Sequence, residues 1–204
     1  MRSWDTGPIS LNSPGQRLPD EHRRLLLKLA SDSIAYGLRH DRALPVDLAE
    51  VPRELREQRA TFVTLQIRDN LRGCIGMLEA RRPLATDVAE NAFAAAFEDT
   101  RFLPLTPPEF GQLDIHISVL SPLEPMTFES EADFLGQLRP GVDGIVIEEG
   151  FHRGTFLPSV WEQLPDREEF LRHLKLKAGL PTAYWSPSIR AQRYTTECFP
   201  SPSG

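Results

Sequence analysis

Residues 61–77 read TFVTLQIRDNLRGCIGM, and this stretch decides the fold class. Residues 61–67 alternate in polarity and are rich in β-branched side chains, which is typical of a strand with one buried face. An Arg-Asp-Asn turn follows at residues 68–70, and an apolar pattern resumes over residues 71–77. The stretch therefore predicts a β-hairpin whose two strands pair antiparallel.

Helical periodicity appears on both sides of this hairpin. Apolar side chains spaced near 3.6 residues predict a helix that begins with an N-cap at Asp20 and frays at Gly37. A second helix is predicted over residues 83–99, with Pro83 in its first turn. Because one face of this second helix is rich in alanine, we expect it to pack closely on a sheet.

Residues 114–120 form the clearest single strand, since Ile115, Ile117 and Val119 point to one face and the residues between them point to the other. The elements predicted downstream are short: helices near residues 131–138, 160–164 and 168–177, and strands over residues 144–148, 154–157 and 191–199. Hairpin-length loops imply antiparallel pairing with helices on one face of the sheet. The predicted fold class is therefore α+β with a mainly antiparallel sheet, rather than a doubly wound parallel sheet.

The length of 204 residues fits one large domain or two interlocked halves that share a core. Residues 1–19 are rich in Ser, Pro and Gly and are expected to form a flexible arm. Residues 20–199 would form the folded domain, and residues 200–204 a frayed end. A weak internal echo, in which a strand, a helix and a pair of strands follow one another, occurs in each half.

A formal net charge of −6 argues against a nucleic-acid-binding protein, because phosphate backbones are bound by clustered Lys and Arg. No apolar run approaches the roughly 20 residues that span a bilayer, and none opens the chain as a secretory signal would. We therefore expect no nucleic-acid or membrane partner, and a cytoplasmic location. Cys74 and Cys198 lie far apart and lack neighbours at metal-ligand spacing, so no metal site is predicted and no cofactor can be named.

The residues that could carry chemistry gather in the second strand of the hairpin. An extended chain over residues 71–76 would place Arg72, Cys74 and Gly76 on one face and apolar side chains on the other. Arg72 could then favour the Cys74 thiolate, or both side chains could bind one anion. Gly73 and Gly76 lack side chains, so backbone or ligand can approach closely. Cys74 is accordingly the candidate nucleophile, and Arg72, Gly73 and Gly76 are candidate ligand-binding residues.

The same residues also admit a structural interpretation. A free cysteine commonly behaves as a small buried hydrophobe. The glycines could serve a bulge or helix packing, and Arg72 could pair with Glu79 or Asp99 as a structural bridge. The sequence leaves both interpretations open.

Three further polar residues are candidate ligand-binding neighbours of the motif: Asn91, Asp99 and Arg101. Asn91 interrupts the apolar stripe of the second helix, while Asp99 and Arg101 close that helix. The alternatives are a hydrogen bond on the helix face for Asn91 and a local ion pair for Asp99 and Arg101. His116 and Ser118 share a strand face, but without a positioned acid they do not make a triad.

The segment Leu71-Arg72-Gly73-Cys74-Ile75-Gly76 resembles the signature of the AMMECR family, whose bacterial and archaeal members are called protein A of the AmmeMemoRadiSam system. The resemblance covers roughly residues 22–199 and continues through further segments: 91–102, 104–106, 113–122, 141–145, 153–161 and 177–180. It implies an α+β fold with two unequal subdomains and a repeated strand–helix–two-strand unit. It also implies association with a Memo-like protein and a radical S-adenosylmethionine (SAM) enzyme, but no settled biochemical activity.

The chain departs from the family pattern at three places. Asp69-Asn70 replaces the usual glycine-containing turn, and Thr100 stands where a proline is typical. His116 stands where an acidic residue is more usual, so a role that depends on an acid there does not carry over to this chain.

Two functional hypotheses follow. In the first, the chain binds or processes a small anionic ligand in a cleft around residues 71–76. In the second, it is a non-catalytic partner or scaffold for a Memo-like protein and a radical SAM enzyme. Whether the chain is an enzyme stays open, because the sequence places no acid–base group beside Cys74.

Overall fold

The structure, a computed structural model, describes residues 17–200. Its helices and strands are, in chain order, α1 (Asp20–His40), η1 (Arg53–Arg56), β1 (Thr61–Ile67), β2 (Asn70–Gly76), α2 (Leu84–Phe97), α3 (Pro107–Phe110), β3 (Asp114–Leu120), β4 (Glu124–Met126), α4 (Glu131–Gln137), β5 (Gly144–Glu149), β6 (His152–Phe156), η2 (Pro158–Glu162), α5 (Arg167–Lys177), β7 (Arg190–Tyr194) and β8 (Thr196–Pro200). The strands form two four-stranded sheets, and every pairing is antiparallel. The predicted α+β class is confirmed.

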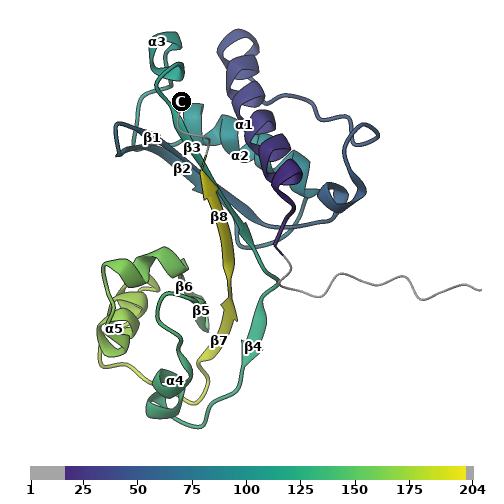
Figure 1. The fold of residues 1–204 in the computed structure, drawn as a ribbon. Helices are drawn as coiled ribbons and strands as arrows, with labels where there is room; N and C mark the ends of the chain where they lie inside the picture. The colour runs from purple at the N-terminus through teal and green to yellow at the C-terminus, as the bar shows by residue number, and fades with distance from the viewer. Residues whose placement is uncertain (1–16, 201–204) are drawn as a thin grey trace, which may run out of the picture.

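The first sheet has the strand order β2-β1-β3-β8, and α1 and α2 cover one of its faces (Figure 1). Alternation decides which side chains face the helices: Val63, Leu65 and Ile117 are fully buried in the core that α1 and α2 complete. Hydrophobic burial of this kind, and not strand propensity alone, fixes the register. The other face of the first sheet therefore carries the even-numbered side chains of β1 and β3.

The second sheet has the strand order β4-β7-β5-β6 and its own core. Helix α5 packs on this sheet, where the rings of Trp161 and Phe170 stack with centroids 3.7 Å apart. Ile145 and Ile147 contribute the sheet side of this core and are almost completely buried. Each sheet thus has its own set of buried apolar side chains.

The two sheets are joined by chain segments that run from one into the other (Figure 1). Residues 191–199, predicted as one strand, are divided at Thr195 into β7 of the second sheet and β8 of the first, so that prediction is corrected. Thr195 pairs there with Ser121, whose side-chain oxygen accepts the Thr195 N–H at 2.9 Å. A small buried cluster that includes Leu120, Val146 and Tyr194 packs at this junction.

The hairpin prediction is confirmed by β1 and β2. Arg68 and Asp69 form its turn with φ values of 51° and 61°, the left-handed conformation that suits a two-residue hairpin loop. The predicted helices are found as α1, α2, α4, η2 and α5. The one-turn helix α3 and the short strand β4 were not predicted.

The predicted arm, residues 1–19, falls largely outside the described residues, as do residues 201–204 of the predicted frayed end. Within the described part, Leu18 is only 7% exposed, and its N–H donates to the Glu197 carboxylate at 2.9 Å. Residues 17–19 are thus attached to the first sheet. The repeated strand–helix–two-strand unit stays a prediction. Among residues 17–200, no helix has the length and apolar character needed to cross a membrane.

Candidate functional site

Strand β2 is an edge strand, and at Cys74 its outward backbone groups are bound by side chains. The Cys74 N–H donates to Asp99 Oδ2 at 2.9 Å, and the Cys74 carbonyl accepts from Arg101 Nη2 at 3.1 Å. Asp99 and Arg101 also bind one another, with Nη2 and Oδ2 2.6 Å apart. This ion pair follows the end of α2. It binds the Cys74 N–H and carbonyl, which would pair with another strand if β2 were not at the edge of the sheet.

The electrostatics of the pair depend on the same contacts. Hydrogen bonds from the Arg101 guanidinium, more than any other contact, hold the pKa of Asp99 far below its ordinary value, and the backbone N–H groups of Cys74 and Arg101 add to this effect. The pKa of Arg101 is raised, first by its hydrogen bond with Asp99 and to a smaller extent by the Cys74 thiol. Asp99 is therefore ionised, and it holds the Arg101 cation at the backbone of Cys74.

The Cys74 thiol is half-buried and lies beside a hydroxyl group of the neighbouring strand. Its Sγ is 3.3 Å from Oγ1 of Thr64, the residue directly opposite on β1. Thr64 in turn lies opposite His116 on β3. Cys74, Thr64 and His116 thus form one row across the sheet, on the face opposite α1 and α2, and all three are half-buried.

The sequence predicted Cys74 as a site residue but not Thr64, and His116 was not counted among the site residues. Neighbours in an antiparallel sheet have Cα atoms about 5 Å apart, so Cys74 and His116 lie on the order of 10 Å apart, a distance that a small ligand can span. The two-residue turn alone would place Val63 opposite Cys74. The bulge at Arg72 shifts the register by one residue and places Thr64 there, and no sequence signal revealed that bulge.

Arg72 occupies a β-bulge. Gly73 lies opposite Leu65, and Leu71 lies opposite Gln66, so Arg72 between them has no partner residue on β1. The Arg72 side chain is therefore positioned by contacts outside the ladder.

Those contacts bind Arg72 to the segment that contains α3. Its guanidinium donates to both carboxylate oxygens of Glu109, at 2.9 Å and 3.2 Å, and to the Leu103 carbonyl at 2.9 Å. Chiefly through the Arg72 hydrogen bond, the pKa of Glu109 is lowered to about 2. The structural bridge that the sequence allowed for Arg72 is present, but its partner is Glu109 rather than Glu79 or Asp99. Arg72 and Arg101 also lie 5.9 Å and 5.5 Å from the centre of the Phe102 ring.

The two glycines of the motif lie against protein backbone. A β-carbon on Gly73 would collide with the Ala95 carbonyl oxygen of α2, and one on Gly76 would collide with the Thr61 carbonyl oxygen. The structure thus places both at close backbone contacts, which agrees with the packing interpretation.

Asn91 lies in α2, beside the start of β1 rather than beside Cys74. Its amide donates to the Thr61 carbonyl at 3.1 Å and to Asp87 Oδ2 at 2.9 Å. Asn91 is 3% exposed and Asp87 is 1% exposed, and Arg82 donates to both. This network satisfies buried polar groups and holds α2 on the sheet.

The site residues therefore separate into two groups. Cys74, Asp99 and Arg101 come together at the edge of β2 with Thr64, whereas Asn91 belongs to the network at Thr61. Within residues 17–200, no group of three or more His, Cys, Asp or Glu side chains is placed to hold a metal ion.

Comparison with known proteins adds a family and a fold. The model of the AMMECR1 family matches residues 27–199. A protein of Methanothermobacter thermautotrophicus is 41% identical over 186 residues, a match that covers 89% of this chain and 95% of that protein. A protein of Thermococcus gammatolerans is 36% identical over 192 residues, covering 90% of this chain and 92% of that protein. The crystal structure of the uncharacterized protein PH0010 from Pyrococcus horikoshii is similar with a TM-score of 0.82 and 32% identity, over 90% of this chain and 93% of that chain.

Proposed function

Because the chain belongs to the AMMECR1 family, we propose that the segment resembling the family signature forms a site for a small anionic ligand, at the edge of β2 around Cys74. In this proposal Arg101 receives the negative group of the ligand, and the Cys74 thiol contacts the ligand. The observation that carries the proposal is that the Arg101 guanidinium, bound by Asp99, donates to the backbone carbonyl of Cys74, the residue that carries the thiol.

Arg101 is better suited than Arg72 to receive an anion. Its side chain is 54% exposed, whereas the Arg72 side chain is 13% exposed. Asp99 and the Cys74 carbonyl occupy Nε and Nη2 of Arg101, and within residues 17–200 no hydrogen bond is made by its Nη1. A planar guanidinium that is fixed on one side and accessible on the other is a preorganised donor for a carboxylate or phosphate group.

The row Cys74, Thr64 and His116 supplies the groups that could process such a ligand. A thiol becomes a nucleophile when its proton is removed, and a neighbouring hydroxyl or imidazole is a suitable acceptor or relay. Thr64 is within hydrogen-bond distance of the thiol, and His116 is the next residue in the row.

The proposal is tested by comparing the small molecules that co-purify with the native chain and with Arg101→Gln. Untargeted mass spectrometry of the compounds released on denaturation should find an acidic metabolite that the native chain retains and Arg101→Gln loses. Arg172→Gln is a matched control, because Arg172 is also half exposed and ion-paired, with Glu169, but lies in α5. Equal retention by all three chains, or no retained acid in any of them, would count against this function.

The partner or scaffold hypothesis is favoured by a different observation. Leu103 is 83% exposed and Leu71 is 43% exposed, and both lie beside Arg72. Apolar side chains at an exposed sheet edge favour docking of another protein, here a Memo-like protein or a radical SAM enzyme. Leu103→Asp should then abolish the complex while Cys74→Ser keeps it, as measured by co-purification of the tagged partner. The reverse result would favour the small-ligand site.

A further inference from the structure

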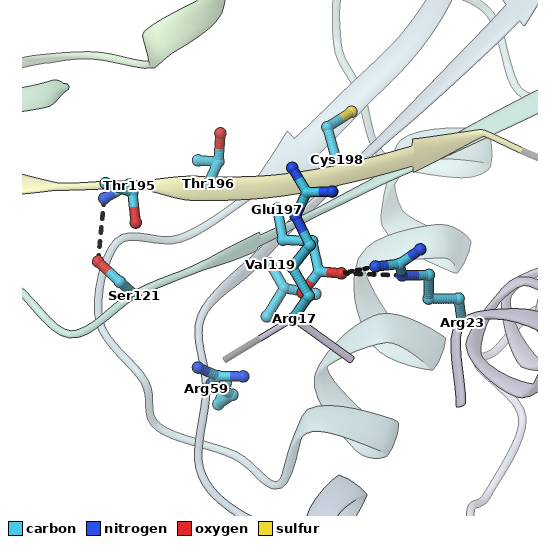
Figure 2. Close-up of a pocket in the computed structure, with 9 residues that line it drawn as sticks. All are labelled: Arg17, Arg23, Arg59, Val119, Ser121, Thr195, Thr196, Glu197 and Cys198. Carbon is cyan, nitrogen blue, oxygen red and sulfur yellow. Dashed lines mark hydrogen bonds and ion pairs between the residues drawn. The ribbon is translucent and has the colours of Figure 1, made fainter. Parts of the chain in front are cut away.

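A pocket lies at the opposite edge of the first sheet, three strands away from Cys74. The pocket has a volume of about 310 Å³ and is formed by β8, the start of α1 and the segment ahead of β1 (Figure 2). The side chains that matter for its chemistry are Arg17, Arg23, Arg59, Thr196, Glu197 and Cys198. Its size lies at the lower end of the range for small-molecule sites.

One acidic side chain of the pocket is already neutralised. Glu197 accepts from Arg23 Nε at 2.8 Å, and its second oxygen accepts from the Leu18 N–H at 2.9 Å. Arg23 also donates to Asp20 at 2.9 Å, so its guanidinium is fully engaged. The Arg23–Glu197 pair forms one wall of the pocket. The charge available to a ligand therefore comes from the other two arginines.

Arg17 and Arg59 are those two arginines. Within residues 17–200 neither makes a hydrogen bond or an ion pair, although Arg59 is half-buried. Figure 2 shows Arg17 reaching from the start of the described chain toward β8, while Arg59 extends from the segment ahead of β1. The Thr196 hydroxyl, on β8, is likewise without a partner in the described part of the chain.

The charge of the pocket contrasts with that of the chain. Three arginines and one glutamate line it, which leaves a formal charge of +2, whereas the whole chain carries −6. Two guanidinium groups without acidic partners in the same pocket give it a positive potential, which favours an anion. A doubly charged oxyanion balances +2, and a single carboxylate does not.

We propose that this pocket binds the phosphate group of a small phosphorylated metabolite, with Arg17 and Arg59 as its charge partners and Thr196 as a hydrogen-bond donor. Guanidinium groups bind phosphate oxygens through two parallel hydrogen bonds, which gives both affinity and orientation. The pocket is independent of the Cys74 site, since β8 and β2 are opposite edges of the same sheet.

Inorganic phosphate is the probe for the test, applied to the full chain at constant ionic strength with acetate as the monovalent comparison. Cys198 lines the pocket and is exposed, so its alkylation by iodoacetamide reports on occupancy at this place. Phosphate should slow labelling of Cys198, and acetate should protect Cys198 far less. Labelling of Cys74 is recorded separately in the same sample. The labelled residue is identified by peptide mass spectrometry.

Arg59→Gln should weaken phosphate binding by about tenfold or more, because a hydrogen bond between two charged groups contributes roughly 1.5–3 kcal/mol. Arg17→Gln should weaken it similarly. Arg24→Gln, an exposed arginine of α1 outside the pocket, is the matched control and should bind as the native chain does. Circular dichroism in the absence of phosphate verifies that each variant is folded.

Three results would overturn the proposal. Phosphate binding could be weakened equally by Arg24→Gln and Arg59→Gln, acetate and phosphate could protect Cys198 equally, or Cys198 could be labelled at the same rate with and without phosphate. Because Cys74 labelling is followed in the same sample, these results are distinguishable from a failure of the Cys74 site.

Discussion

Glu109 is bound from two sides. Its carboxylate accepts both hydrogen bonds from Arg72 and also those of the Thr106 backbone N–H and hydroxyl, at 2.8 Å and 2.7 Å. The Thr106 contacts form a capping box for α3, and the Arg72 contacts attach that helix to the bulge of β2. One carboxylate thus joins a short helix to the motif strand.

Glu109→Gln should therefore lower stability in a pH-dependent way. The pKa of Glu109 is about 2 in the folded chain and ordinarily 4.5, so its stabilising effect is fully present above pH 4.5 and is lost as the pH falls through 2. We expect Glu109→Gln to cost about 1 kcal/mol at neutral pH, since the pair is partly exposed, and nothing below pH 2. Urea unfolding of both chains across pH 2–7 measures this difference.

The control for this experiment is Glu98→Gln, because Glu98 is exposed and makes no side-chain ion pair in the described part of the chain. A difference in the free energy of unfolding between the native and Glu109→Gln chains that stays constant down to pH 2 would contradict the ionic role of Glu109.

At the scale of single residues, the sequence predicted most residues of the candidate site but not all of their contacts. Cys74, Asp99 and Arg101 do come together, yet the cation bound at the Cys74 backbone is Arg101, whereas Arg72 pairs with Glu109. Strand alternation predicted that Arg72 and Cys74 share a face, but the bulge at Arg72 interrupts that alternation, so this prediction is corrected. Alternation also does not predict which carboxylate a long flexible guanidinium binds. That choice depends on where α3 is placed by the rest of the fold.

At the scale of elements, the contact between α2 and β2 depends on Gly73. The Ala95 carbonyl of α2 occupies the space that a side chain at position 73 would need. The same helix is followed by Asp99 and Arg101, which bind the backbone of Cys74. The distance between helix and strand therefore also sets the geometry of the candidate site.

Gly73→Ala should destabilise the chain by about 2 kcal/mol or more, because its β-carbon would press on backbone atoms that cannot rotate away. Gly136→Ala is the matched control: it lies in helix α4, and a β-carbon there would meet nothing within 4 Å. That control should be neutral or slightly stabilising, since alanine is the better helix former. Urea unfolding measures the free energy of unfolding of each variant. Equal values for Gly73→Ala and Gly136→Ala would contradict the close-contact role of Gly73.

Elements with strong periodicity were predictable, and elements created by tertiary contacts were not. Helix α2 and strands β1 and β3 follow from their apolar patterns. Helix α3 lies in a proline-rich segment and is fixed by Thr106 and Glu109, and residues 191–199 divide where the chain changes sheets at Thr195. A continuous strand pattern does not reveal which partner strand each half will have.

At the scale of the whole molecule, the two sheets are coupled by chain segments and by buried side chains. Tyr194 ends β7 and is 1% exposed, and burial raises the pKa of its phenol to about 12. Its hydroxyl donates to the Phe156 carbonyl at 3.1 Å, while Leu120 of β3 packs in the same cluster. The junction thus buries side chains from both sheets.

This coupling predicts that the two sheets unfold together. In a Trp4→Phe chain, the remaining tryptophans, Trp161 and Trp185, report on the second sheet, because both pack in its core. Accessibility of Cys74 to a thiol reagent reports on the first sheet. The two urea transitions should share one midpoint. Separate midpoints would show that the halves fold independently and that the junction contributes little.

The most direct test of the Cys74 site compares two alkylating reagents that differ in charge. In a Cys198→Ser chain, the ratio of the rates of Cys74 alkylation by anionic iodoacetate and neutral iodoacetamide measures the local attraction for anions. We expect Arg101→Gln to lower this ratio roughly fivefold, as about 1 kcal/mol of attraction at ~4 Å in water implies, and Arg172→Gln to leave it unchanged. A ratio that is the same in native and Arg101→Gln chains would contradict the account.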